Sequence, residues 1–157
     1  MYSIFNIYLR MNPGGHMSFR EKIAWLYLIA IVITFGPYFT LTALQTPPEQ
    51  IMPDLRRLGL FAITTVAQML IIGVGQLYFR LGSPQEARFP PDERDQAISS
   101  RSITWAYYVL ISGMILVGCV MPFASGGWEL VNAAVLMIVL AEIVHYGLTV
   151  FHYRRQS

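Results

Sequence analysis

Four long stretches of this sequence carry almost no charge, and their length limits the folds that the chain can adopt. They cover residues 23–44, 58–79, 103–123 and 128–151. Each is about long enough to cross a hydrocarbon core of ~30 Å at ~1.5 Å of rise per residue. Because backbone polar groups in lipid must be satisfied within the segment, we expect each stretch to be a transmembrane helix.

The low charge of the whole chain agrees with a membrane protein. Charged residues make up 13% of the sequence and hydrophobic residues 55%, whereas soluble domains carry about 25% charged residues. We predict an all-α, integral-membrane four-helix bundle of two antiparallel hairpins, with residues 17–157 as a single membrane domain. Residues 1–16 contain the helix-breaking run Asn12-Pro13-Gly14-Gly15, and we expect them to be poorly ordered or an over-called N-terminal extension.

The distribution of positive charge predicts an orientation. With four spans, both termini and the central loop lie on one side of the membrane. Nine of the 11 Lys and Arg residues belong to these segments, and the other two, Arg56 and Arg57, precede the second stretch. Cytoplasmic segments carry the excess of positive charge. We therefore predict a bacterial inner-membrane protein whose N and C termini are cytoplasmic.

The last apolar stretch contains an ionisable pair, Glu142 and His145. Ionisable groups in lipid are costly and mark paired or functional positions. His145 and Thr149 follow Glu142 by three and seven residues, which places the three side chains on one helix face. Gln68 in the second stretch is expected to hydrogen-bond to another span, because an unpaired amide in hydrocarbon is costly. Glu142, His145, Gln68 and Thr149 form the candidate intramembrane polar site.

Three interpretations of this site are open. Glu142 and His145 have the Glu-x-x-His spacing of half a di-metal motif, with His152 as a further weak ligand. The other three stretches contain no acid, so no metal or cofactor is expected. A lone membrane carboxylate also suits proton- or cation-coupled transport, as in small four-helix multidrug exporters. In the third interpretation, Glu142 is either protonated or hydrogen-bonded to His145, Gln68 or a tyrosine. It then stabilises the bundle or senses a ligand.

The central loop, residues 80–102, is the only sizeable segment outside the predicted membrane. Asp92 is the expected N-cap of a helix that continues into the third stretch, and Glu93 and Asp95 place negative charge in its first turn. Acidic and basic residues balance in the loop, so no direct nucleic-acid binding is expected. The alternating charges suit salt bridges or contact with a cytoplasmic protein partner. The candidate partner motif comprises Asp92, Glu93, Arg94 and Asp95.

Small residues within the stretches indicate close helix packing. Gly73, Gly75, Gly113 and Gly118 are expected to let neighbouring helices approach each other. Such residues permit a homodimer without requiring one. The single cysteine, Cys119, is interpreted as a small packing residue, and the absence of a second cysteine argues against a paired-cysteine thiol oxidoreductase.

Two segments resemble a bacterial family of small, four-helix predicted membrane proteins of unknown function. The first is Met17-Ser18-Phe19-Arg20-Glu21-Lys22, which leads into Ala24-Trp25. The second is Asp92-Glu93-Arg94-Asp95, followed by Ala106-Tyr107-Tyr108-Val109-Leu110, which is similar to the cytoplasmic Asp-Glu-Arg signature and third span of that family. The resemblance covers residues 17 to about 151. Because the family is associated with small helix-turn-helix regulators, it implies a membrane-held regulator or inhibitor.

The sequence contains no complete catalytic constellation, so no enzymatic activity is predicted. The leading hypothesis is an accessory or regulatory membrane protein that presents its cytoplasmic loop to a soluble partner. The first alternative is a small proton- or cation-coupled transporter that uses Glu142. The second is a metal or cofactor binder.

Overall fold

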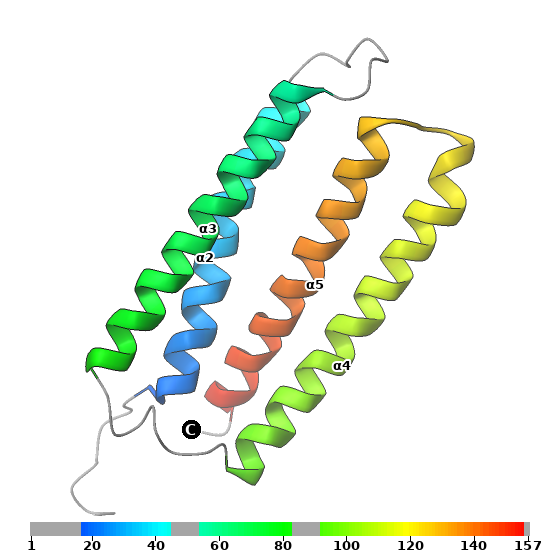
Figure 1. Ribbon diagram of the computed structural model, residues 1–157. Helices are drawn as coiled ribbons and strands as arrows, with labels where there is room; N and C mark the ends of the chain where they lie inside the picture. The colour runs from blue at the N-terminus through cyan, green and yellow to red at the C-terminus, as the bar shows by residue number, and fades with distance from the viewer. Residues whose placement is uncertain (1–16, 45–53, 83–91, 156–157) are drawn as a thin grey trace, which may run out of the picture.

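The computed structural model describes residues 17–44, 54–82 and 92–155, and this part of the chain forms four long helices (Figure 1). The helices are α2 (Phe19–Leu44), α3 (Leu55–Gly82), α4 (Glu93–Ile115) and α5 (Trp128–Arg155). Helices α2, α3 and α5 are each long and apolar enough to cross a membrane, and so is α4 when the turns that follow it are included. The predicted all-α bundle with four candidate spans is therefore confirmed. The expectation for residues 1–16 lies outside the described residues, and the orientation stays a prediction.

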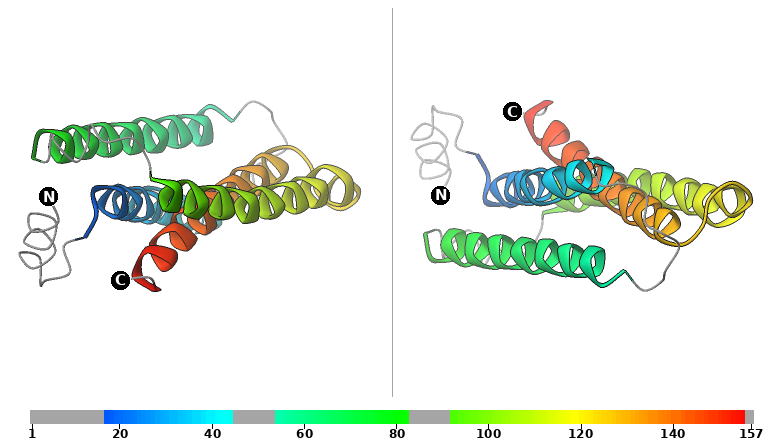
Figure 2. Two further views of the ribbon diagram at one scale, coloured as in Figure 1. Left: turned by 90° about the horizontal axis from the view of Figure 1, so that it is seen from below. Right: turned by 90° about the horizontal axis from the view of Figure 1, so that it is seen from above.

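The helices form two antiparallel hairpins, as predicted. α2 pairs with α3, and α4 pairs with α5 (Figure 1). The hairpins meet where α2 packs against α5, so these two helices are central and α3 and α4 are peripheral (Figure 2). We call the end where α2 begins and α5 finishes the terminal end, and the other the distal end.

The core lies where the central helices cross. Ile31, Phe35 and Tyr38 of α2 are buried together with Val139 of α5. The hydroxyl of Tyr38 donates a hydrogen bond of 2.7 Å to Oδ1 of Asn132, which joins the two hairpins near the distal end. Most other apolar side chains are exposed, and α3 buries only one residue among those described, Arg57. Exposed apolar surface of this kind is what lipid would cover.

Two of the four glycines expected to allow close packing do so. A Cβ atom on Gly75 would lie 2.6 Å from Cδ1 of Leu26, and one on Gly113 would lie 2.5 Å from Sδ of Met137. Those glycines let α3 approach α2 and let α4 approach α5. Gly73 and Gly118 face open space, so the prediction was wrong for them. Cys119 is exposed as well, which contradicts its interpretation as a packing residue.

Helix α4 begins as the sequence predicted and ends differently. The carboxylate of Asp92 caps the helix, and the carboxylate of Asp95 accepts a reciprocal bond from the backbone N–H of Asp92, which completes a capping box. The third span is not one regular helix to its end. It continues as a π-helical segment, η2 (Leu116–Val120), and a 3₁₀ turn, η3 (Met121–Phe123), before the short connection to α5. Pro122, which cannot donate a backbone hydrogen bond, lies in that final turn.

Candidate functional site

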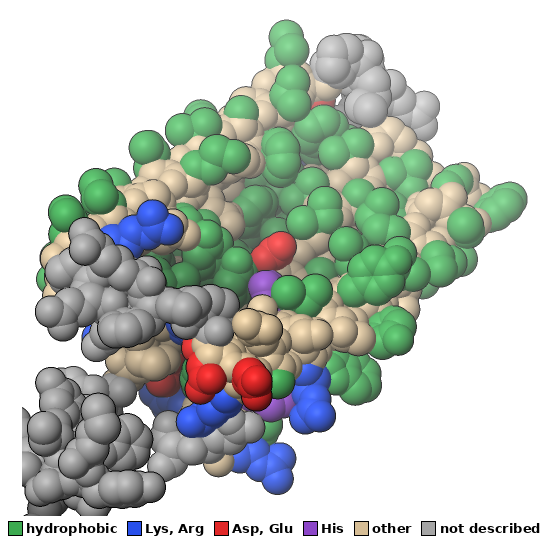
Figure 3. Space-filling model, turned by 60° about the horizontal axis from the view of Figure 1, so that its bottom comes forward, with side chains coloured by type: hydrophobic (Ala, Val, Ile, Leu, Met, Phe, Trp, Pro, Cys, Tyr) green, Lys and Arg blue, Asp and Glu red, His purple; other side chains and the backbone are tan. Residues whose placement is uncertain are grey.

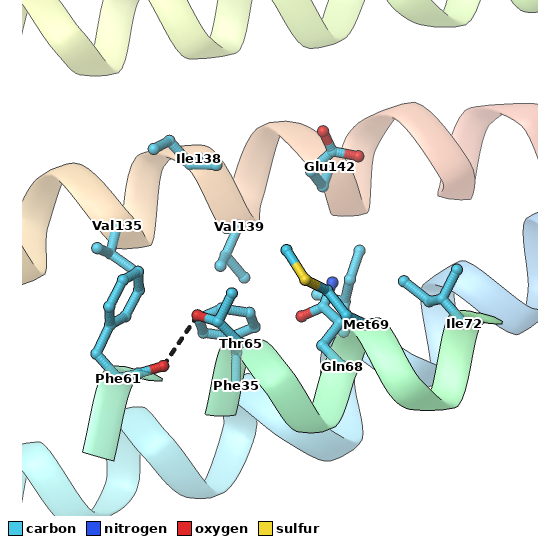
Figure 4. Close-up of a pocket in the computed structure, with 11 residues that line it drawn as sticks. Phe35, Phe61, Thr65, Gln68, Met69, Ile72, Val135, Ile138, Val139 and Glu142 are labelled. Carbon is cyan, nitrogen blue, oxygen red and sulfur yellow. Dashed lines mark hydrogen bonds between the residues drawn. The ribbon is translucent and has the colours of Figure 1, made fainter. Parts of the chain in front are cut away.

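A pocket of about 250 Å³ lies between the two hairpins, and Figure 4 shows it in close-up. Its walls come from α2, α3 and α5, and almost all of them are apolar. They consist of Ile31, Phe35, Phe61, Thr65, Gln68, Met69, Ile72, Val135, Ile138, Val139 and Glu142. The pocket therefore brings together Gln68 and Glu142, two of the four residues in the predicted polar site.

The polar groups of this pocket differ in how well they are satisfied. The hydroxyl of Thr34 lies within hydrogen-bond distance of Oε1 of Gln68, at 3.1 Å, and of the carbonyl of Ala30 in its own helix, at 2.8 Å. The contact with Gln68 confirms the predicted bond to another span. Thr65 donates to the carbonyl of Phe61 in its own helix at 2.9 Å. Glu142 makes no hydrogen bond or ion pair within the described part of the chain. Glu142 is thus the one acidic residue among those that line the pocket, and its carboxyl group has no hydrogen-bond or ion-pair partner in the described chain.

Glu142 lies at the rim of the pocket. Its side chain is exposed, and it points from α5 toward the side of α4, away from Gln68 (Figure 4). In the space-filling view, hydrophobic side chains cover both hairpins around a hollow in which acidic and histidine side chains lie (Figure 3). An unpaired carboxylate facing hydrocarbon is costly. A molecule that carries a complementary group would lower this cost.

The other residues on the polar face of α5 bond locally. The hydroxyl of Thr149 donates to the carbonyl of His145 at 2.8 Å, and Nδ1 of His152 lies 2.7 Å from the carbonyl of Leu148. The imidazole of His145 stacks on the ring of Tyr146, with 4.6 Å between centroids. The structure places no hydrogen bond between Glu142 and His145. Within the described ranges, no three His, Cys, Asp or Glu side chains gather in a metal-binding group.

A polar contact between the hairpins lies next to this face and was not predicted. The ring of Tyr146 stacks on that of Tyr27 in α2, with 4.5 Å between centroids. Nε2 of Gln76 in α3 donates a hydrogen bond of 2.6 Å to the hydroxyl of Tyr27. One tyrosine of α2 thus contacts both α3 and α5. The sequence shows Tyr27 and Gln76 as polar residues inside apolar stretches, but their spacing does not show that they contact each other.

The terminal end is held by a second group of polar contacts, also missed from the sequence. Nε of Arg20 lies 3.0 Å from Oδ2 of Asp95, and the hydroxyl of Tyr153 donates to Oδ1 of Asp95 at 2.6 Å. One carboxylate therefore joins α2, α4 and α5. Nε of Arg154 lies 3.6 Å from the buried carboxylate of Glu21.

These contacts assign structural roles to half of the predicted partner motif. Asp92 caps α4 and Asp95 joins three helices. The side chains of Glu93 and Arg94 are exposed at the terminal end. The loop that precedes them, residues 83–91, lies outside the described residues, so the partner prediction stays a prediction.

Comparisons with known protein families, curated proteins and solved structures find no match for this chain. The resemblance to a family of small four-helix membrane proteins, carried by residues 17–25 and Asp92–Asp95, stays a hypothesis.

Proposed function

We propose that the protein is a small proton- or cation-coupled transporter of the bacterial inner membrane, and that Glu142 is its charge-carrying group. One observation carries the proposal: an acid without a hydrogen bond or ion pair in the described chain lies at the rim of an apolar pocket in the spanning region. A carboxyl group in such a place exchanges its proton for a cationic ligand, because only one positive charge neutralises it at a time.

The walls of the pocket indicate the ligand class. Phe35 and Phe61 supply aromatic surface, and the remaining walls are almost wholly aliphatic. Aromatic faces attract cations, and apolar walls bind an apolar body. A lipophilic cation therefore fits this site better than a hydrophilic ion does. The ligand would enter sideways from the bilayer, since the pocket lies between the hairpins.

Binding of tetraphenylphosphonium to the detergent-purified protein tests the proposal. We expect binding to release a proton into a weakly buffered solution, and we expect Glu142→Gln to abolish both the binding and the release. Glu129→Gln is the matched control, because Glu129 is the other acid of α5 and is exposed in its first turn. In proteoliposomes, a proton gradient should drive uptake of the cation by the native protein and not by Glu142→Gln.

Two results would count against this function. One is that the Glu142→Gln protein binds tetraphenylphosphonium with unchanged affinity. The other is that the native protein binds the cation without releasing a proton. A thermal unfolding midpoint for Glu142→Gln equal to that of the native protein ensures that lost binding does not reflect lost folding.

A second candidate function is that of an accessory or regulatory protein whose cytoplasmic loop contacts a soluble partner. It is supported by the exposed charge of Glu93 at the start of α4. Asp95 is unsuitable for testing it, because changing that residue also breaks the contacts to Arg20 and Tyr153. Glu93→Lys should abolish recovery of a partner in a pull-down, whereas Glu129→Lys at the distal end should leave recovery unchanged. Equal recovery with both variants would argue against it.

A further inference from the structure

A second hollow lies at the terminal end, outside the pocket of Glu142. It has a volume of about 410 Å³ and lies between the first turns of α2 and the first turns of α4. Its polar lining comprises Arg20, Asp95, Gln96, Ser99, Ser100 and Thr104. From this lining we infer that the hollow binds the headgroup of a zwitterionic phospholipid with a primary amine. This inference is independent of any transport function.

The hollow lies at the level expected for lipid headgroups. The charge-free part of α4 begins at Ile103, which also lines the hollow. Trp105, Tyr107 and Tyr108 follow within two turns, and all three side chains are more than half exposed. Exposed tryptophan and tyrosine gather at the membrane–water boundary, where the ring meets lipid and the polar atom meets water. The hollow is therefore at the boundary and not beyond it.

The lining offers donors suited to a phosphate group. Nε of the Arg20 guanidinium pairs with Asp95, and this ion pair holds the guanidinium in place. Its two terminal nitrogens can then donate to a ligand. Ser99 and Ser100 are exposed on consecutive positions of α4. The hydroxyl of Thr104, which also lines the hollow, donates to the carbonyl of Ser100 at 2.8 Å, so its hydrogen is already used within α4. Serine hydroxyls and arginine nitrogens are the donors commonly found around phosphate oxygens.

The charge balance of the hollow selects a zwitterionic headgroup. Arg20 and Asp95 neutralise each other at 3.0 Å, so the site has no net charge to hold a simple anion. The exposed carboxylates of Asp92 and Glu93 lie one turn further from the bilayer along α4. A headgroup whose phosphate lies beside Arg20 and whose ammonium lies beside these two carboxylates has each of its charges next to a charge of opposite sign. A primary ammonium donates hydrogen bonds to carboxylates, whereas a quaternary ammonium has no N–H to donate.

An apolar stripe continues from the hollow along the same face of α4. Ile103, Tyr107 and Ile111 are spaced by four residues, and all three side chains are exposed. Acyl chains of a lipid held by its headgroup would lie along this stripe. A free phosphate or a soluble phosphoethanolamine compound would not use it. The juxtaposition of a neutral polar hollow with an apolar stripe thus favours the intact lipid.

Native mass spectrometry of the purified full chain tests the inference. The protein is mixed in detergent with equal amounts of phosphatidylethanolamine, phosphatidylcholine and phosphatidylglycerol, and the bound lipids are counted. We expect phosphatidylethanolamine to be retained about tenfold more than either of the others, which corresponds to ~1.4 kcal/mol. An excess of glycerophosphoethanolamine, which has the headgroup but no acyl chains, should not displace it.

The double variant Ser99→Ala with Ser100→Ala should lower the retention of all three lipids, because the serines are inferred to contact the phosphate that these lipids share. It should not disturb the fold, since both side chains are exposed. Ser112→Ala is the matched control, since Ser112 is an exposed hydroxyl of α4 that does not line the hollow. Equal retention of the three lipids, or unchanged lipid retention by the double variant, would overturn the inference. Displacement by glycerophosphoethanolamine would also overturn it, because the site would then bind a soluble headgroup.

Discussion

Arg20 of α2 and Asp95 of α4 form an ion pair of 3.0 Å between helices that belong to different hairpins. The same carboxylate accepts the hydroxyl of Tyr153 from α5. The peripheral helix α4 is thereby fixed to both central helices at the terminal end. A carboxylate with this many partners contributes more to the stability of the fold than an acidic side chain on the surface with a single partner does.

Asp95→Ala should therefore destabilise the bundle. The change removes the ion pair, the tyrosine bond and half of the capping box, and we expect a loss of about 1–3 kcal/mol. The unfolding free energy in mild detergent measures it. Glu93→Ala is the control, because Glu93 is an exposed acid in the same helical turn. Similar losses of unfolding free energy in the two variants would show that Asp95 contributes only through the interaction of its negative charge with the helix dipole.

Gln68→Leu should weaken the contact between α2 and α3. The amide accepts from Thr34 at 3.1 Å, and such bonds between spans contribute about 0.6–1.7 kcal/mol. Thr34→Val should cost a similar amount, and the double variant should cost little more than either single variant. Thr64→Val is the control, because the hydroxyl of Thr64 bonds only to the carbonyl of Leu60 in its own helix. Additive effects of Gln68→Leu and Thr34→Val would contradict the bond.

Gly113→Ala should push α4 away from α5. The added methyl group would lie 2.9 Å from Cβ of Met137, an atom that the side chain cannot move aside by changing its rotamer. We expect a loss of about 1–3 kcal/mol. Gly73→Ala meets nothing within 4 Å, so it should be neutral or stabilise α3 by up to ~1 kcal/mol. Thermal unfolding of the two variants side by side distinguishes a contact effect from a general effect of replacing glycine.

Cysteine labelling tests the predicted orientation. The exposed Cys119 is first changed to serine, and single cysteines are then placed at Ser18 or Ser125, at opposite ends of the bundle. If both termini are cytoplasmic, a membrane-impermeant reagent should label Ser125→Cys in intact cells and label Ser18→Cys only after lysis. The reverse pattern would place the termini outside, and the positive charges would then not have set the topology.

The sequence predicted the parts of this fold that depend on one segment at a time. Apolar stretches located the four helices, and Asp92 followed by acidic residues located the start of α4, because spans and caps are local properties. The interspan bond of Gln68 was also predictable, since a buried amide needs a partner. Its partner, Thr34, was not, because the choice depends on how α2 and α3 are rotated about their axes.

The candidate site was predicted only in part for the same reason. Glu142 and Gln68 line one pocket, but His145 and Thr149 bond within α5. Helix periodicity places residues on a face without showing which helix covers it. Likewise, nothing local distinguishes Gly113, which contacts Met137, from Gly118, which faces open space. The π-helical segment at Leu116–Val120 has no counterpart in the pattern of apolar residues either.

The contacts that join α2 to α5 have a consequence for biosynthesis. Glu21 and Tyr38 find their partners, Arg154 and Asn132, on the last of the described helices to leave the ribosome. Until that helix emerges, Glu21 and Tyr38 of the first hairpin lack these partners. Chains interrupted before α5 should therefore be recognised as incomplete and degraded by membrane proteases, whereas finished chains should persist.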